Sequence, residues 1–291
     1  MLALAPPTGV SLRNAPALLV DHAGAESNTC VGLARLGLRT AWVSCLGADA
    51  AGDRILAAIR AEGVDVQWVE RSATRPTGLM LKEPDAGVQY YRRESAASAM
   101  GPALLDPVPV SEARAVLVTG VTALIGAGAL AAGLALLERA RGLRVVDPNL
   151  RAGLWGSARR AALVRPFVER CDLVLAGFDE LAEVLGAGKA EAAGGAEALA
   201  RAATALGPRE VVVRAASTVG ALADGVWSEL DIRRDAAVDP IGAGDAFNAG
   251  YVAVRLRGGP VDAALRAGVR CGAAVTTALS DTAGFPRNAA L

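Results

Sequence analysis

Short apolar runs alternate with helix-like segments through the second half of the chain. Each run is continuously apolar, whereas a strand with one face in water would alternate between apolar and polar residues. This alternation predicts a parallel sheet with helices on both faces, which is an α/β fold. The predicted strands cover residues 115–120, 143–146, 172–175 and 210–214, and the predicted helices reach about Arg141 and Arg170 or cover 196–206 and 261–278.

The first part of the chain has shorter and more varied patterns. Residues 30–36 show apolar positions at helical spacing, and Gly37 is placed to end that helix. A strand is predicted at 40–45. Residues 2–5 resemble the last part of a strand that two prolines end.

Two further runs predict a β-hairpin, because residues 77–83 and 88–94 flank the turn-forming segment 84–87. Strand alternation places Val88, Tyr90 and Arg92 on one face. The hairpin has polar residues on both faces, which suits a core poorly. We therefore expect it to be a lid over a site.

Polar residues follow several of the predicted strands. In parallel α/β sheets, ligands bind at the carboxyl ends of the strands. The sequence therefore predicts a site at this edge of the sheet. The residues there are Gly120, Asp147, Asn149, Arg151, Glu180 and the segment 242–245.

The segment 239–250 combines a glycine-containing loop with the start of a helix. Gly242 and Gly244 allow positive φ and close approach of the backbone to a ligand. Free N–H groups at a helix N-terminus bind anions, so a phosphate fits here. Asp245 is placed to take a proton from an attacking hydroxyl group. The alternative is that the loop is only a turn and Asp245 only a helix cap.

Composition narrows the classes of function. The 291 residues fit one large domain, and 30 basic residues balance 30 acidic ones, so no strong field attracts nucleic acid or an anionic membrane. The four widely spaced cysteines indicate reduced thiols and a cytoplasmic protein. A single histidine, His22, makes histidine-based metal sites and triads poor candidates. No apolar run has membrane-spanning length, and the N-terminus lacks the basic start of a signal peptide.

A dinucleotide-binding motif is a poor match. Phe247 stands where the third glycine of G-x-G-x-x-G would be, and no Walker motif occurs. In contrast, residues 239–247 (DPIGAGDAF) resemble the C-terminal signature of the ribokinase-like, or PfkB, carbohydrate kinases. The segments 24–28 and 34–37 resemble the N-terminal motif of that family, so the resemblance covers nearly the whole chain.

The resemblance implies a three-layer α/β/α sandwich with a mostly parallel sheet. It implies one ribokinase-like kinase domain over residues 1–291, with lid segments at about 12–23 and 74–98. A narrower resemblance is to the 2-keto-3-deoxygluconate kinase branch. It rests on residues 90–98, 119–122, 147–151 with Trp155, and Asp281 before Gly284-Phe285-Pro286.

The family resemblance also implies roles for individual residues. Asp245 would be the catalytic base, and the N–H groups of Gly242, Ala243 and Gly244 would form an anion hole. Arg92 and Arg151 would bind the substrate carboxylate. The other implied substrate-binding residues are Gly24, Asn28, Tyr90, Val121 and Asp281; Ser217 and Gly220, with Gly242 and Gly244, would bind the nucleotide, and Glu180 would hold Mg²⁺ through water.

The resemblance implies ATP and Mg²⁺ as cofactors, a small sugar acid as substrate, and a homo-oligomer. Alternatives remain for single residues. Arg151 could bridge helix ends, Tyr90 and Arg92 could form a solvated hairpin face, Glu180 could complement a helix dipole, and Asp281 could be an ordinary loop acid. A neutral sugar kinase acting on fructose or ribose, and a non-catalytic sugar- or nucleotide-binding pseudokinase, are the alternative functions.

The sequence departs from the family pattern in four places. Ala23 replaces the first of two adjacent glycines, and Gly177 stands where many members have asparagine. The nucleotide loop, predicted at 214–220, carries alanines where glycines are usual. Family members begin with a β-strand and a Gly-Glu step that would precede Leu2, and without such a strand we expect an unpaired sheet edge.

Overall fold

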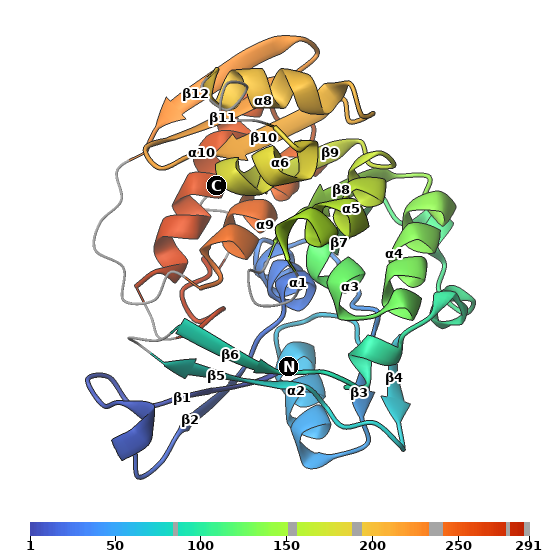
Figure 1. Ribbon diagram of the computed structural model, residues 1–291, viewed down its shortest axis with the longest axis vertical. Coiled ribbons are helices and arrows are strands. Elements are labelled where there is room, and N and C mark those ends of the chain that lie inside the picture. Colours follow the sequence, from blue (N-terminus) through green and yellow to red (C-terminus); the bar gives the residue numbers. More distant parts are fainter. Residues whose placement is uncertain (84–86, 151–155, 188–193, 233–240, 278–279, 288–291) are drawn as a thin grey trace.

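The computed structural model describes residues 1–83, 87–150, 156–187, 194–232, 241–277 and 280–287. Its largest element is a six-stranded sheet with the strand order β12-β11-β10-β9-β8-β7 (Figure 1). β7 to β10 are parallel neighbours, as the continuous apolar runs predict, and β11 and β12 add an antiparallel hairpin. The strands are β7 (Ala115–Thr119), β8 (Leu143–Asp147), β9 (Leu173–Gly177), β10 (Glu210–Arg214), β11 (Thr218–Ala223) and β12 (Val226–Asp231).

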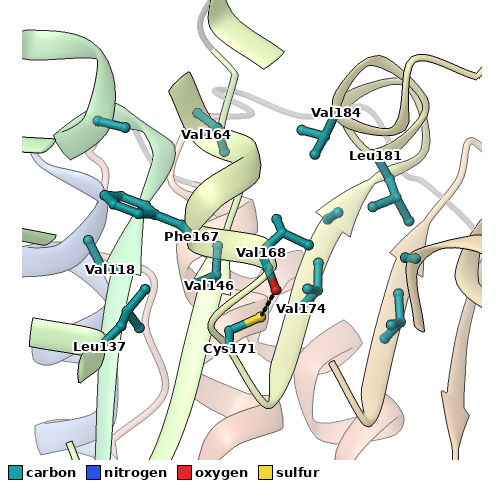
Figure 2. Close-up of a cluster of buried hydrophobic side chains, with 14 of the residues drawn as sticks. Val118, Leu137, Val146, Val164, Phe167, Val168, Cys171, Val174, Leu181 and Val184 are labelled. Atoms are coloured by element: carbon teal, nitrogen blue, oxygen red, sulfur yellow. Dashed lines mark hydrogen bonds between the residues drawn. The ribbon is translucent and has the colours of Figure 1, made fainter. Parts of the chain in front are cut away.

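Helices cover both faces of this sheet, which makes the three-layer sandwich (Figure 1). Successive residues of one strand serve opposite cores: Val146 packs with the helices of one face, and Val145 packs with those of the other. Figure 2 shows the first core, where Phe167 and Val164 lie against Val146. The first face carries α3 (Gly120–Ile125), α4 (Ala127–Arg139), α5 (Ser157–Val168), α6 (Phe178–Leu185) and α8 (Gly195–Thr204), and the second carries α9 (Ala243–Leu256) and α10 (Val261–Val275).

The helix predicted to run from residue 120 to about Arg141 is two helices, α3 and α4. They separate at Gly126, where an added Cβ would lie 2.3 Å from the carbonyl oxygen of Ser98. The approach of that backbone leaves room only for glycine, and the chain turns there. Nothing in the local hydrophobic pattern reports such a distant contact.

A four-stranded sheet, which we call the small sheet, lies apart from the large one (Figure 1). Its order is β2-β1-β5-β6, with β1 parallel to β5 and the other pairs antiparallel. The hairpin predicted around residues 84–87 is confirmed by the pairing of β5 with β6. The segment 2–5, predicted to be the end of a strand, is an inner strand of this sheet. The strands are β1 (Leu2–Ala5), β2 (Leu19–His22), β5 (Leu79–Glu83) and β6 (Gly87–Tyr91).

The remaining N-terminal elements form a third unit beside the small sheet. β3 (Ser44–Gly47) pairs in parallel with β4 (Val69–Ser72). The strand predicted at 40–45 therefore begins later, since Ala41 makes only an isolated bridge to Asp65. The helices are α1 (Ala25–Arg35) and α2 (Ala50–Ala61), and short 3₁₀ turns lie at Leu12–Asn14, Ala97–Ala99, Pro102–Leu105 and Val110–Glu112.

In the described part of the chain, no helix is both long and apolar enough to cross a bilayer.

Candidate active site

One cavity of about 940 Å³ brings together residues from the small sheet, α1, the end of β7 and the start of α9. It also extends between β3 and β7, each of which is the last strand of its sheet in the described part of the chain. Seven residues that the sequence analysis selected line it: Gly24, Asn28, Tyr90, Arg92, Val121, Asp245 and Asp281.

The turn before α9 is built around Gly242. Its φ is +88°, and an added Cβ would lie 2.4 Å from the carbonyl oxygen of Asp281. Positive φ and a backbone neighbour together require glycine here. α9 then begins at Ala243, so that the first N–H groups of the helix have no acceptor within the helix. Asp245 is the third helical residue and only 4% exposed.

A chain of hydrogen bonds joins Asp245 to the small sheet. Asn28 Nδ2 donates to Asp245 Oδ2 at 2.8 Å and to Asp281 Oδ2 at 3.2 Å. Lys82 Nζ on β5 donates to Asp281 Oδ1 at 2.6 Å. All four side chains are buried. Asn28 Oδ1 is also buried and has no hydrogen-bond partner among the described residues, so it can accept a hydrogen bond from a ligand in the cavity.

Val88, Tyr90 and Arg92 lie on one face of the hairpin, as strand alternation predicts, and this face points inward. Val88 and Tyr90 pack against the small apolar cluster around Met80, and Arg92 is buried just beyond β6. The guanidinium carbon of Arg92 lies 4.4 Å from the centroid of the Tyr90 ring. Stacking on the Tyr90 ring fixes the position of the guanidinium group, and Arg92 places its positive charge at the cavity wall.

A second polar cluster lies on the other side of the α9 N-terminus. Arg214 Nη1 donates to Asn248 Oδ1 at 2.7 Å, and Asn248 Nδ2 donates to Asp147 Oδ2 at 2.6 Å. Arg214 Nη2 lies 3.4 Å from the same Asp147 oxygen, and a Cβ added at Gly244 would lie 3.8 Å from Arg214 Nη2. The cluster therefore places a cation beside the first turn of α9.

Neither Asn248 nor Lys82 is among the site residues predicted from the sequence. Asn248 stands three residues after Asp245, a spacing that places two helical side chains on one face. Lys82 stands two residues after Met80 in a strand whose burial alternates, so strand periodicity directs it inward. Both patterns are visible in the sequence, but the roles of these two residues follow only from their contacts with residues distant in the chain.

Glu26 links α1 to the end of β7. Its Oε1 accepts hydrogen bonds from the backbone N–H of Thr119 at 3.1 Å, from Thr119 Oγ1 at 2.7 Å and from Thr122 Oγ1 at 2.8 Å. These bonds fix the first turn of α3, and with it Val121 at the cavity wall. Glu26 lies inside the predicted motif at 24–28 but was not predicted to have a role of its own.

The predicted nucleotide loop is shorter than residues 214–220. β10 ends at Arg214 and β11 begins at Thr218, which leaves three residues between them. Ser217 is exposed in this turn, whereas Gly220 is buried inside β11. A Cβ at Gly220 would lie 2.1 Å from the Trp227 ring, so this glycine makes room for a side chain of the neighbouring strand. Neither residue lines the cavity.

Glu180 lies in the first turn of α6, away from the cavity lining. Its Oε2 accepts a hydrogen bond from the Gly177 N–H at 2.9 Å, which caps the helix. In the described ranges, no three acidic, histidine or cysteine side chains group as metal ligands would. Arg151 lies outside the described residues.

Comparison with known proteins gives a consistent result. The model of the pfkB family of carbohydrate kinases matches residues 5–288. The chain is 33% identical to the 2-dehydro-3-deoxygluconokinase of Bacillus subtilis, over 91% of this chain and 83% of that protein. It is 29% identical to the 2-dehydro-3-deoxygalactonokinase of Haloferax volcanii, over 97% of this chain and 90% of that protein. The fructokinase of Vibrio cholerae, solved with fructose, ADP and calcium ion, superimposes with a TM-score of 0.85 at 22% identity, covering 99% of this chain and 94% of the other.

Proposed function

Because this chain belongs to the pfkB family of carbohydrate kinases, we propose that it phosphorylates a sugar acid, 2-keto-3-deoxygluconate, with ATP as the phosphoryl donor. The observation that carries the proposal is the buried carboxylate of Asp245 at the start of α9, in one cavity with Asn28, Tyr90 and Arg92. The 2-keto and 2-dehydro names denote the same compound.

Asp245 is the proposed base. A hydroxyl group of the sugar in the cavity would give its proton to Asp245 while its oxygen attacks the γ-phosphorus of ATP. The bond between that phosphorus and the ADP oxygen breaks, so one phosphoryl group moves and one proton is stored on the carboxylate. The hydrogen bond from Asn28 to Asp245 Oδ2 orients the carboxylate for this step.

The start of α9 would stabilise the phosphoryl group during transfer. The N–H groups of Gly242, Ala243 and Gly244 are the proposed anion hole, and the helix dipole adds to their effect. Arg214 would bring a full positive charge to the same place, since its guanidinium lies beside Gly244. The rigid contacts of Arg214 with Asn248 and Asp147 hold that charge in position before the substrate binds.

Arg92 is the residue that favours an acid over a neutral sugar. Arg92 is buried in the cavity wall, where its guanidinium group would pair with the carboxylate of an acid substrate. Arg151 is proposed to bind the same carboxylate. The likeness to kinases of 2-dehydro-3-deoxygluconate and 2-dehydro-3-deoxygalactonate supports this substrate class.

The nucleotide is proposed to lie along Ser217 and the Gly242–Gly244 turn, on the outer side of α9. Mg²⁺ would neutralise charge on the phosphate oxygens of the nucleotide, and Glu180 is the proposed residue to hold it through water. The small sheet is proposed to act as the lid of the site.

We also propose that two copies of the chain associate through the small sheet. Leu19 and Val20 of β2 and Tyr91 of β6 are exposed large apolar side chains, and all three lie on its two edge strands. Edge strands that expose apolar residues tend to pair with another chain. Light scattering of the wild type and of Tyr91→Glu tests this, because a dimer that uses β6 should become monomeric in the variant.

The test of the function is a coupled assay of ADP release with four acceptors: 2-keto-3-deoxygluconate, 2-keto-3-deoxygalactonate, fructose and ribose. We expect the highest kcat/KM with a keto-deoxy acid. The variant Arg92→Met should lose about tenfold or more with the acid because a charge-assisted pair is lost, and much less with a neutral sugar. A wild type that prefers fructose or ribose would contradict the acid assignment, and a wild type that releases no ADP with any acceptor would contradict the kinase assignment.

A further inference from the structure

We propose that Lys82 is a positioning residue that couples the small sheet to the catalytic base through Asp281 and Asn28. The inference rests on the proposed function of Asp245 as base and adds a residue to that site. Lys82 does not line the cavity, so it acts through Asp281 and not on the substrate.

The connection is continuous and buried. Lys82 Nζ lies 2.6 Å from Asp281 Oδ1, and Asn28 Nδ2 bridges Asp281 Oδ2 and Asp245 Oδ2 at 3.2 and 2.8 Å. Lys82 is 9% exposed, and Asn28, Asp245 and Asp281 are 1–4% exposed. Its members come from β5, the segment after α10, α1 and α9, which no local interaction would bring together.

The chemistry of the cluster gives Lys82 a specific task. Two carboxylates share one amide donor, and two buried negative charges close together disfavour ionisation of both. A carboxyl group must be ionised to act as the base. The ammonium group of Lys82 compensates the negative charge of Asp281, so that Asp281 can hold the amide of Asn28 beside the carboxylate of Asp245.

Asp281 also contacts the turn before α9 through its backbone. Its backbone carbonyl oxygen packs against the α-carbon of Gly242, where a Cβ would lie at 2.4 Å. The same residue therefore touches both the base, through Asn28, and the turn that starts α9. If β5 moves relative to the segment 280–282, both contacts of Asp281 change together.

Other charged groups lie near the cluster and contribute to its electrostatic potential. Arg92 after β6, Glu26 on α1 and the α-amino group of Met1 lie close enough to interact electrostatically with one another or with Asp281. Asp21 on β2 accepts a hydrogen bond from Ser280, next to Asp281. Arg214 on β10 lies near Gly244, on the other side of the helix start. Of these, none is hydrogen-bonded to Asp281 in the contacts that the described residues make, so Lys82 is the cation with the direct contact.

The first test is kinetic. Lys82→Met keeps an unbranched side chain that is one heavy atom shorter and removes its charge. We expect kcat at pH 7 to fall about tenfold and the acidic limb of the pH–kcat profile to move to higher pH by about one unit, because protonation of the carboxylate pair becomes easier. KM for ATP should not change. Lys82→Arg should recover most of the activity, and Arg93→Met, which removes an exposed cation beside the same sheet, should match the wild type.

The second test needs no substrate. It is a double-mutant cycle on the thermal midpoint with Lys82→Met, Asp245→Asn and the double variant. Lys82→Met should lower Tm by about 8 °C in the wild type, as breaking a buried pair does. In the Asp245→Asn background the loss should be about half as large, since one of the two negative charges is gone. Additive losses, or an unshifted pH profile in an active Lys82→Met, would overturn the proposal. If the wild type phosphorylates no sugar, the cycle still decides whether Lys82 and Asp245 are coupled.

Discussion

The two ends of α9 serve opposite purposes. At its start, Gly242 has positive φ, the first N–H groups lack acceptors in the helix, and the carboxylate of Asp245 is buried. Further along the helix, every polar group has a strong partner: Tyr251 donates to Glu210, and Arg255 binds the same carboxylate through Nε and Nη2 at 3.0 and 2.8 Å.

This difference shows how one helix can hold a reactive group in place. Burial and the Glu210 carboxylate raise the pKa of the Tyr251 phenol well above its usual range, so that Tyr251 stays a neutral hydrogen-bond donor. The far end is thus a fixed anchor on β10. The near end keeps donors and a carboxylate available for a ligand, and the anchor prevents the helix from shifting to satisfy them.

The largest expected effect comes from Asp245→Asn. We expect kcat to fall about 10³-fold because the proposed base is lost, which is within the range that general-base removal causes. The fold should survive, since the amide oxygen of asparagine can still accept the hydrogen bond from Asn28. Measurement of ADP release and of Tm on the same sample checks both. Activity within tenfold of the wild type would refute the role of Asp245.

Gly242→Ala tests the backbone turn at the start of α9. The new Cβ would collide with the carbonyl oxygen of Asp281, and the alanine would have to adopt a positive φ. We therefore expect kcat to fall about 100-fold and the free energy of unfolding to fall by about 3 kcal/mol. Gly258→Ala is the matched control: Gly258 has φ +79°, no atom within 4 Å of an added Cβ, and no place in the cavity lining. It should cost about 1 kcal/mol with unchanged kcat. Equal losses in the two variants would mean that the contact with Asp281 has no special role.

Tyr251→Phe tests the anchored end. Removal of the hydroxyl group deletes one hydrogen bond to Glu210 but leaves its pair with Arg255, so we expect the unfolding free energy to fall by about 1 kcal/mol. Urea unfolding and kcat should separate, with stability reduced and kcat unchanged. A variant with normal stability and reduced kcat would reverse the assignment of the two ends.

The smallest expected effect concerns Asp21, which holds Ser280 beside Asp281. Burial alone would raise the pKa of Asp21, but hydrogen bonds from His22 and Ser280 outweigh it and lower the pKa to about 2 from 3.8. A lowered pKa adds stability above about pH 4, and this contribution is lost progressively as the pH falls from about 4 through 2. Because the side chain is 36% exposed, the contribution should be at most about 1 kcal/mol. Asp21→Asn should therefore be less stable than the wild type at pH 7, and the difference should be clearly smaller at pH 2; an equal difference at both pH values would contradict the assignment.

The hydrophobic pattern was sufficient to predict the four parallel strands of the large sheet, although it merged α3 and α4 into one helix. Continuous apolar runs such as Val211–Val213 have only one explanation in this length of chain, which is burial on both faces. The small sheet was harder. β1 and β2 are each four residues long, and β1 pairs with β5, far away in the chain, so that its partners leave no local signal.

Only the part of the site that local motifs form could be predicted from the sequence. Asp245 and the glycine turn form a local motif, and seven of the selected residues share the cavity. Lys82 and Arg214 act through contacts with Asp281 and Asp147, which lie 199 and 67 residues away. Spacing alone cannot show such pairs. For Gly220 the sequence predicted a loop position, while the packing of Trp227 gives this glycine a place inside a strand.

The segment 280–285 has a consequence for how the protein is made. Asp281 contacts Lys82, Asn28 and Gly242, and Arg35 binds the carbonyl oxygens of Thr282 and Phe285 at 2.6 and 3.2 Å. The ribosome adds this segment after every helix and strand that it joins. A nascent chain can therefore assemble the large sheet during synthesis, but it acquires the finished cavity only when residues 280–285 have left the exit tunnel. The cavity is thus completed only after all the residues of the large sheet have been made.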